Sequence, residues 1–143
     1  MSKQIFVGEY NKRFNEILGT NIEQKEIFRS SGLTSHLIKR NHGSCLKHID
    51  DIPDIIKQPD YIGINPNEGG LSIELVKKYK NNVLIGIKVD ATTDSLYIST
   101  MFDLQESKLQ RRVHSGRLIK YDNIEEITTT EESIEERDKS DES

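Results

Sequence analysis

The sequence predicts an α+β domain, because helical patterns dominate the first part of the chain and strand patterns the later part. The chain has 143 residues, the size of one ordinary domain with room for a real core. Apolar residues recur at helical spacing before residue 40, whereas a strand-like alternation prevails between residues 82 and 102. We therefore expect one folded domain over residues 1–122.

The N-terminal part of the chain predicts a short strand followed by two helices. Residues 5–7 form an apolar run suited to a strand. Apolar side chains then recur at helical spacing from Tyr10 to Leu18, and Gly19 is expected to end this helix. Leu33 and Leu37 place an apolar stripe on a second helix, which carries His36.

The middle of the chain predicts three short elements. A helical turn from residue 52 should end before Pro59, and residues 61–66 suit a short strand closed by proline. A further helix is expected over residues 72–79, with Ser72 as its N-cap and a buried face of Leu75, Val76 and Tyr79.

Two strands and a hairpin are predicted next. Residues 82–90 place four aliphatic side chains on one face, and Leu84, Gly86 and Lys88 on the other. Residues 90–95 suit a turn into a second strand over residues 96–102. In that strand Thr100 shares its face with the apolar residues, so we expect it to pack in the core unless a β-bulge redirects it.

The last predicted elements are a helix and an edge strand. Asp103 and Glu106 resemble a capping box that starts a helix through Val113. Ser115 and Gly116 should end that helix, and residues 117–121 can return as an edge strand.

Charge is distributed unevenly along the chain. Residues 123–143 hold nine acidic and two basic residues, so the remaining 1–122 hold 20 − 2 = 18 basic and 24 − 9 = 15 acidic residues. The body is therefore mildly basic, which permits contact with a polyanion without requiring it. The composition of the tail predicts a solvated, disordered segment.

The sequence predicts a cytoplasmic protein with no membrane contact. It holds no apolar run long enough to span a bilayer and no secretory signal, and Cys45 has no partner for an internal disulfide. Cys45 lies in no nucleophile motif and is expected to be inert. Neither HExxH nor a paired Cys/His spacing is present, so we expect no metal site and no cofactor.

The pair formed by His36 and Arg40 is the first candidate site. Four residues apart, they share one side of a helix, where a proton-exchanging group and a phosphate-binding cation can act together. A solvated helix face with an incidental histidine is an equally good interpretation. Lys88, beside Gly86 on an apolar strand, should face either solvent or a ligand.

A second candidate is the group of Arg111, Arg112 and Arg117 with the hydroxyl of Ser115. These side chains are suited to binding successive phosphates, although a charged helix face is the more frequent meaning of such a cluster.

Five segments in a fixed order carry a family resemblance. They are HLIKRNH, IPDIIKQPDYIGINP, SIELVKKYKNNVLIGIKVD, LYISTMFDLQESKLQRR and HSGRL. Over residues 30 to 121 the chain resembles phage-type members of the barnase, EndoU, colicin and RelE-like nuclease superfamily. The resemblance implies a barnase/RelE-like α+β fold, with N-terminal helices packed on an antiparallel sheet.

The resemblance also implies metal-independent cleavage of RNA, in which the ribose 2′-hydroxyl attacks the adjacent phosphate and leaves a cyclic phosphate. By motif position, His36 would be the general acid/base, Arg40 and Arg117 the phosphate stabilisers, and Thr100 and Ser115 the hydroxyls that contact the phosphate. Further substrate contacts are expected from Lys39, His42, Lys88, Lys108, Arg111, Arg112 and His114.

Two alternatives remain open from the sequence. One is an inactive module of the same fold that binds RNA or a protein. The other is the toxin of a toxin and antitoxin pair, for which a protein inhibitor would be a partner besides RNA.

Overall fold

A computed structural model describes residues 3–23, 26–39, 43–67, 70–90 and 95–121. The expected acidic tail, Arg40 and His42 therefore lie outside the described residues. The described residues form seven strands and several short helices, in the order β1 (Gln4–Glu9), α1 (Arg13–Leu18), β2 (Glu26–Ser30), α2 (Leu33–Lys39), the 3-10 helix η1 (Gly43–Asp51), α3 (Ile52–Lys57), β3 (Tyr61–Ile64), β4 (Ser72–Lys78), β5 (Asn82–Val89), β6 (Leu96–Leu104), α4 (Glu106–Ser115) and β7 (Leu118–Lys120).

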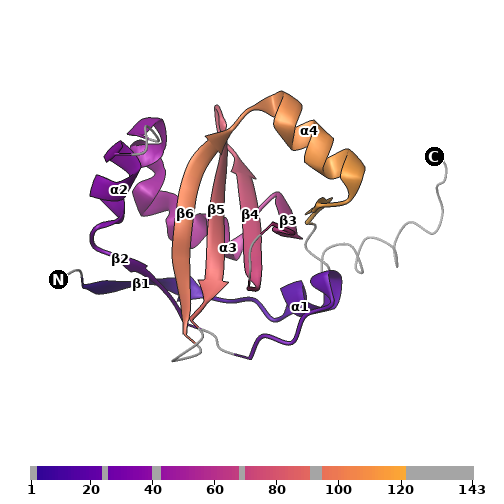
Figure 1. Cartoon of the computed structure of the whole chain (residues 1–143), viewed down its shortest axis with the longest axis horizontal. Helices are drawn as coiled ribbons and strands as arrows, with labels where there is room; N and C mark the ends of the chain where they lie inside the picture. The colour runs from indigo at the N-terminus through magenta and orange to yellow at the C-terminus, as the bar shows by residue number, and fades with distance from the viewer. Residues whose placement is uncertain (1–2, 24–25, 40–42, 68–69, 91–94, 122–143) are drawn as a thin grey trace, which may run out of the picture.

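The strands form one mixed sheet in the order β1-β2-β6-β5-β4-β3-β7 (Figure 1). The α+β class is confirmed, but the expectation of an antiparallel sheet is wrong at one pair of strands. β2 pairs with β6 in parallel through Ile27↔Leu96 and Phe28↔Tyr97, whereas the other neighbouring strands pair antiparallel. The difference arises at β2, a strand that the sequence patterns did not single out, and it attaches the β1–β2 ribbon to the central strands.

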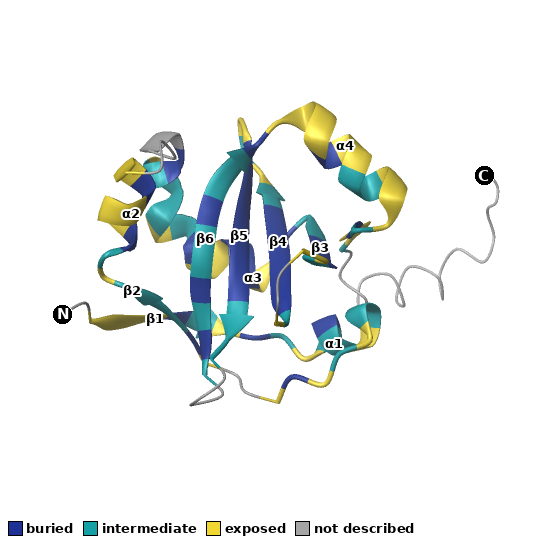
Figure 2. Cartoon of the chain, viewed as in Figure 1, coloured by how far each residue is buried: buried dark blue, intermediate teal, exposed yellow. Residues whose placement is uncertain are grey.

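The main core lies on one face of the sheet. Aliphatic side chains of the strands, such as Ile73, Ile85 and Ile87, belong to one buried cluster with Phe14 of α1 and Leu37 of α2. The same cluster includes three isoleucines of α3, namely Ile52, Ile55 and Ile56. Figure 2 shows β4 and β5 buried along most of their length. Burial of these apolar surfaces is the largest favourable contribution to the stability of the fold.

A smaller core lies on the opposite face, under α4. Leu109 of α4 packs with Val76, Leu84, Leu104 and Leu118, and each of these side chains is buried. Adjacent residues of β5 thus serve opposite faces, as a strand with period two requires. Because α4 covers only one end of this face, polar residues of the neighbouring strands are left to line a pocket.

Several predicted element ends are confirmed. α1 ends at Gly19 and α4 ends at Gly116, and both glycines adopt the left-handed conformation, with φ of 73° and 86°. This conformation costs glycine little because it has no Cβ. The strand near residue 5, the helical turn before Pro59, the β5–β6 hairpin and the edge position of β7 also agree with expectation.

The predicted helix over residues 72–79 is wrong, because these residues form strand β4. Both faces of β4 are covered: Ile73 and Leu75 pack in the main core, and Val76 packs under α4. A strand buried on two faces shows a nearly continuous apolar run, which periodicity does not distinguish from a helix.

The predicted capping box at Asp103 is also wrong. Asp103 lies within β6, and α4 begins at Glu106 with Gln105 as its N-cap. The strand continues through Leu104 because that side chain belongs to the core under α4. No helix in the described part of the chain is long and apolar enough to cross a membrane.

Candidate functional site

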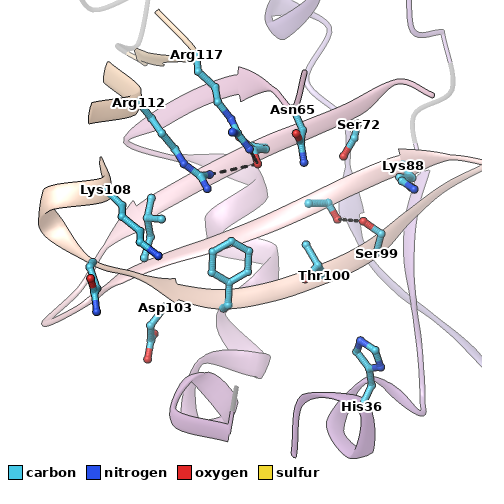
Figure 3. A pocket seen from close by; sticks show the side chains of 15 residues that line it. His36, Asn65, Ser72, Lys88, Ser99, Thr100, Asp103, Lys108, Arg112 and Arg117 are labelled. Carbon is cyan, nitrogen blue, oxygen red and sulfur yellow. Dashed lines mark hydrogen bonds and ion pairs between the residues drawn. The ribbon is translucent and has the colours of Figure 1, made fainter. Parts of the chain in front are cut away.

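A pocket of about 650 Å³ opens on the part of the sheet face that α4 leaves uncovered (Figure 3). Polar side chains from strands β4, β5 and β6, from helices α2 and α4, and from the segment before β7 converge on it. Its lining consists of His36, Asn65, Ser72, Glu74, Gly86, Lys88, Ser99, Thr100, Phe102, Asp103, Leu104, Gln105, Lys108, Arg112 and Arg117. Four of these residues are Lys or Arg and two are carboxylic acids, so the lining favours an anionic ligand.

A β-bulge turns Thr100 towards this pocket. Gly86 pairs with Thr100 while Ile87 pairs with Ile98, so Ser99 is an extra residue in β6. The extra residue reverses the alternation of side chains, which is the usual effect of a bulge. The core-facing position expected for Thr100 from parity is therefore wrong, and the condition attached to it, a bulge, is met. The Ser99 hydroxyl donates a hydrogen bond to the Gly86 carbonyl at 3.2 Å.

Gly86 keeps the floor of the pocket open. A Cβ at this position would lie 2.9 Å from Cγ2 of Thr100 and 3.3 Å from Oγ of Ser99. The missing side chain allows β5 and the bulge of β6 to approach each other closely.

Glu74 is the buried anion of the site and holds two arginines. Its side chain is only 4% exposed. Arg117 donates to it through Nε at 3.0 Å and Nη2 at 2.8 Å, and Nη1 of Arg112 lies 3.4 Å from Oε2. The paired donors of Arg117 match the geometry of a carboxylate, which makes this a strong charge-assisted contact. Glu74 therefore fixes where both guanidinium groups lie.

Opposing effects act on the charge of Arg112. Burial lowers the pKa of its guanidinium below the ordinary value, the charge of Glu74 opposes this effect, and the nearby Arg117 cation adds to it. Two cations held side by side repel each other, so an anion that enters the pocket would relieve this repulsion.

Gly63 positions the backbone at Arg117. β3 pairs with β7 through Gly63↔Leu118, and a Cβ on Gly63 would lie only 1.9 Å from the carbonyl oxygen of Arg117. No side chain fits there without moving this edge strand. The location of Arg117 thus depends on a glycine that does not itself line the pocket.

His36 lies across the pocket from the two arginines, on the exposed side of α2 (Figure 3). Leu33 and Leu37, on the same helix, are buried in the main core and orient α2 so that His36 faces outward. Lys88 extends from β5, where it pairs with Ser72 of β4 and Tyr97 of β6.

The structure brings part of the sequence-predicted set together. The pocket is lined by His36, Lys88, Thr100, Lys108, Arg112 and Arg117. Four other candidates, Lys39, Arg111, His114 and Ser115, are exposed and do not line it. The Ser115 hydroxyl donates instead to the carbonyl of Arg112 at 3.1 Å.

Sequence reasoning missed Glu74, because the segment that carries it, residues 72–79, was wrongly predicted to be a helix. The signal was present: in a strand, Glu74 shares a face with Ser72 and Val76, beside Gly86 of the next strand. Asn65 and Phe102 also line the pocket and were missed for a different reason: which side chains of paired strands share a face depends on residues distant in sequence.

Cys45 is fully buried in the main core. Burial, and to a lesser extent the negative charge of Asp103, raise the pKa of its thiol to about 11. The thiolate is therefore scarce at neutral pH, and the thiol lies outside the pocket.

No group of three His, Cys, Asp or Glu side chains within the described ranges is arranged to hold a metal ion.

A comparison with protein-family models matches most of the chain to a nuclease family. The model of the phage-Barnase-EndoU-ColicinE5/D-RelE like nuclease3 family covers residues 5–111, well over half of the chain. No curated protein and no solved structure matches the chain. The matched region includes Glu74, Lys88 and the bulge at Ser99, whereas Arg112 follows it directly and Arg117 lies beyond its end. The chain belongs to this family of phage-type, barnase-, EndoU-, colicin- and RelE-like nucleases.

Proposed function

We propose that this protein is a metal-independent endoribonuclease that cleaves RNA by attack of the ribose 2′-hydroxyl on the adjacent phosphate. The observation that carries the proposal is the pocket in which Glu74 holds Arg117 and Arg112, with His36 on the opposite side. Membership of a nuclease family supports phosphodiester chemistry at this site. We also infer that the α+β fold is a variant of the barnase/RelE-like arrangement.

The proposed reaction needs positive charge near the phosphate. As the 2′-oxygen attacks, charge accumulates on the non-bridging oxygens of the phosphorane, and fixed cations stabilise it more than they stabilise the ground state. Arg117 and Arg112 supply these cations, because Glu74 holds them in place before the substrate arrives. Glu74 is thus a positioning residue in this scheme.

The reaction also needs a group that exchanges protons. His36 is suited to this role, since an imidazole ring can both accept and donate a proton. The hydroxyl of Thr100, turned to the pocket by the bulge, can donate to a phosphate oxygen. Lys88 and Lys108 extend the positive lining on two sides and are proposed to bind neighbouring phosphates.

The proposal is tested by incubating the full-length protein with RNA in EDTA and mapping the product ends. We expect 2′,3′-cyclic phosphate ends, and no cleavage at a single 2′-deoxy substitution, which removes the nucleophile. His36→Ala should lower kcat by about 100-fold to 10,000-fold, the range for loss of a general acid or base. Ser35→Ala on the same exposed side of α2 is the matched control and should cleave at the original rate.

Two results would contradict the proposal. Equal cleavage of RNA and DNA would show that the 2′-hydroxyl is not the nucleophile. Full-rate cleavage by a folded His36→Ala protein would remove His36 from the reaction.

A further inference from the structure

A second pocket of about 370 Å³ adjoins the first. Three of its lining residues, Asp103, Leu104 and Gln105, also line the first pocket, so the two meet where β6 passes into α4. The rest of its lining comes from the β4–β5 turn and the start of α4, namely Lys78, Tyr79, Lys80, Asn81, Asn82 and Glu106.

The charge of the second pocket differs from that of the first. Its two lysines are balanced by Asp103 and Glu106, whereas cations exceed carboxylic acids by four to two in the first pocket. A neutral lining suits a ligand that offers both hydrogen-bond donors and acceptors, rather than a bare anion. The edge of a nucleobase has this character.

The frame of the second pocket is fixed. The buried amide of Asn82 donates to the carbonyl of Leu104 and to Oε1 of Glu106, both at 3.1 Å, and so ties β5 to the end of β6 and the start of α4. The carbonyl of Asn81 accepts from the Tyr79 N–H, and that of Gln105 accepts from the Leu109 N–H, both at 2.9 Å. The backbones that carry the two exposed amides, Asn81 and Gln105, are therefore held in place.

We propose that this second pocket binds the base next to the cleaved bond and reads it through the side-chain amides of Asn81 and Gln105. The inference rests on the proposed function, because it places the scissile phosphate between Arg117 and His36 in the first pocket. A strand bound in this way passes over residues 103–105, with its phosphate among the cations and its neighbouring base in the neutral pocket. A side-chain amide forms two hydrogen bonds with the edge of adenine, and the carboxylate of Glu106 can accept one from an exocyclic amine. Bases that bear an amino group are therefore favoured over uracil.

The test compares the wild type with the Asn81→Ala/Gln105→Ala double variant on short RNAs that differ only in the base beside the cleaved bond. For the wild type we expect a preference of about tenfold for amino-bearing bases over uracil on one side of the bond, within the range of a good amide–base pair. The double variant should lose this preference and show a KM about tenfold higher, with kcat retained. The control is Gln4→Ala/Gln58→Ala, which removes two exposed amides outside both pockets.

An unchanged base preference in the double variant would overturn the inference, as would a fall in kcat with KM unchanged. A wild type that cleaves no RNA would refute the proposed function and leave the second pocket open to a binding test. In that test, fluorescence anisotropy measures the affinity for 2′-deoxy strands with the same base changes. Loss of base discrimination in the double variant would support the pocket, and equal discrimination by both proteins would overturn it.

Discussion

Replacement of Glu74 by Gln tests the ion pair at the centre of the site. The substitution keeps the shape of the side chain and removes a charge that is only 4% exposed. Breaking a buried ion pair costs about 3–5 kcal/mol, because the remaining partner stays desolvated. The side chains of Arg117 and Arg112 are 19% and 21% exposed and regain some hydration, and the amide oxygen of Gln can still accept one hydrogen bond. We therefore expect a loss of about 2 kcal/mol.

Urea denaturation of the folded proteins measures this loss. With a slope of about 1–3 kcal/mol per molar urea, the midpoint should fall by about 1 M while the slope stays unchanged. A double-mutant cycle with Arg117→Gln should give a coupling energy of about 1–2 kcal/mol, because the residues share two hydrogen bonds. Glu23→Gln, at an exposed position, is the control and should shift stability by less than about 0.5 kcal/mol. A midpoint for Glu74→Gln within about 0.2 M of the wild type would refute the reasoning.

Three further outcomes are expected. Gly86→Ala should lower the free energy of unfolding by about 1–3 kcal/mol, because the added Cβ overpacks against Thr100, and it should raise KM. Gly70→Ala is the control: its Cβ would meet no atom within 4 Å, so KM should not change. Calorimetry measures the stability of both variants and steady-state kinetics measures their KM. Tyr79→Phe should gain about 0.5–1 kcal/mol, because the buried hydroxyl has no hydrogen-bond partner in the described part of the chain. The pKa of Tyr79 is raised from 10.0 to about 12, mainly by burial, so the folded state holds the hydroxyl proton more tightly than the unfolded state does. The stability that depends on this proton is present below pH 10 and lost as the pH rises towards 12. Urea midpoints should therefore fall less steeply above pH 10 in the variant, and an equal fall in both proteins would contradict this account. Cys45, with a pKa of about 11, should react with a disulfide reagent at pH 8 only after urea unfolds the protein, and rapid labelling of the folded chain would count against its burial.

The sequence patterns predicted those elements whose signals are local. The helix ends at Gly19 and Gly116 were foreseeable because a left-handed residue at a helix end favours glycine. The β5–β6 hairpin followed from alternation in two adjacent segments. β4 was misjudged because its burial on two faces depends on β5, on α4 and on helices far away in sequence.

The candidate site was predictable only in part for the same physical reason. Lys88 was identified because its parity with Gly86 is visible in one segment. Thr100 faces the pocket because the pairing of β5 with β6 shifts register, and the alternation of residues within β6 does not predict such a shift. Glu74 becomes recognisable only when β4 is a strand and the arginines that follow Leu109 return to meet it.

The contact between Gly63 and the carbonyl of Arg117 bears on how mutational maps of this protein should be understood. In a saturation screen selected for activity, position 63 should tolerate as few replacements as the pocket itself, because any Cβ would displace the edge strand that presents Arg117. An intolerant glycine in the strand next to the edge would then indicate that two backbones lie too close together for a side chain. Loss of activity at position 63 would then reflect the close packing of β3 against the segment that carries Arg117, although Gly63 does not line the pocket.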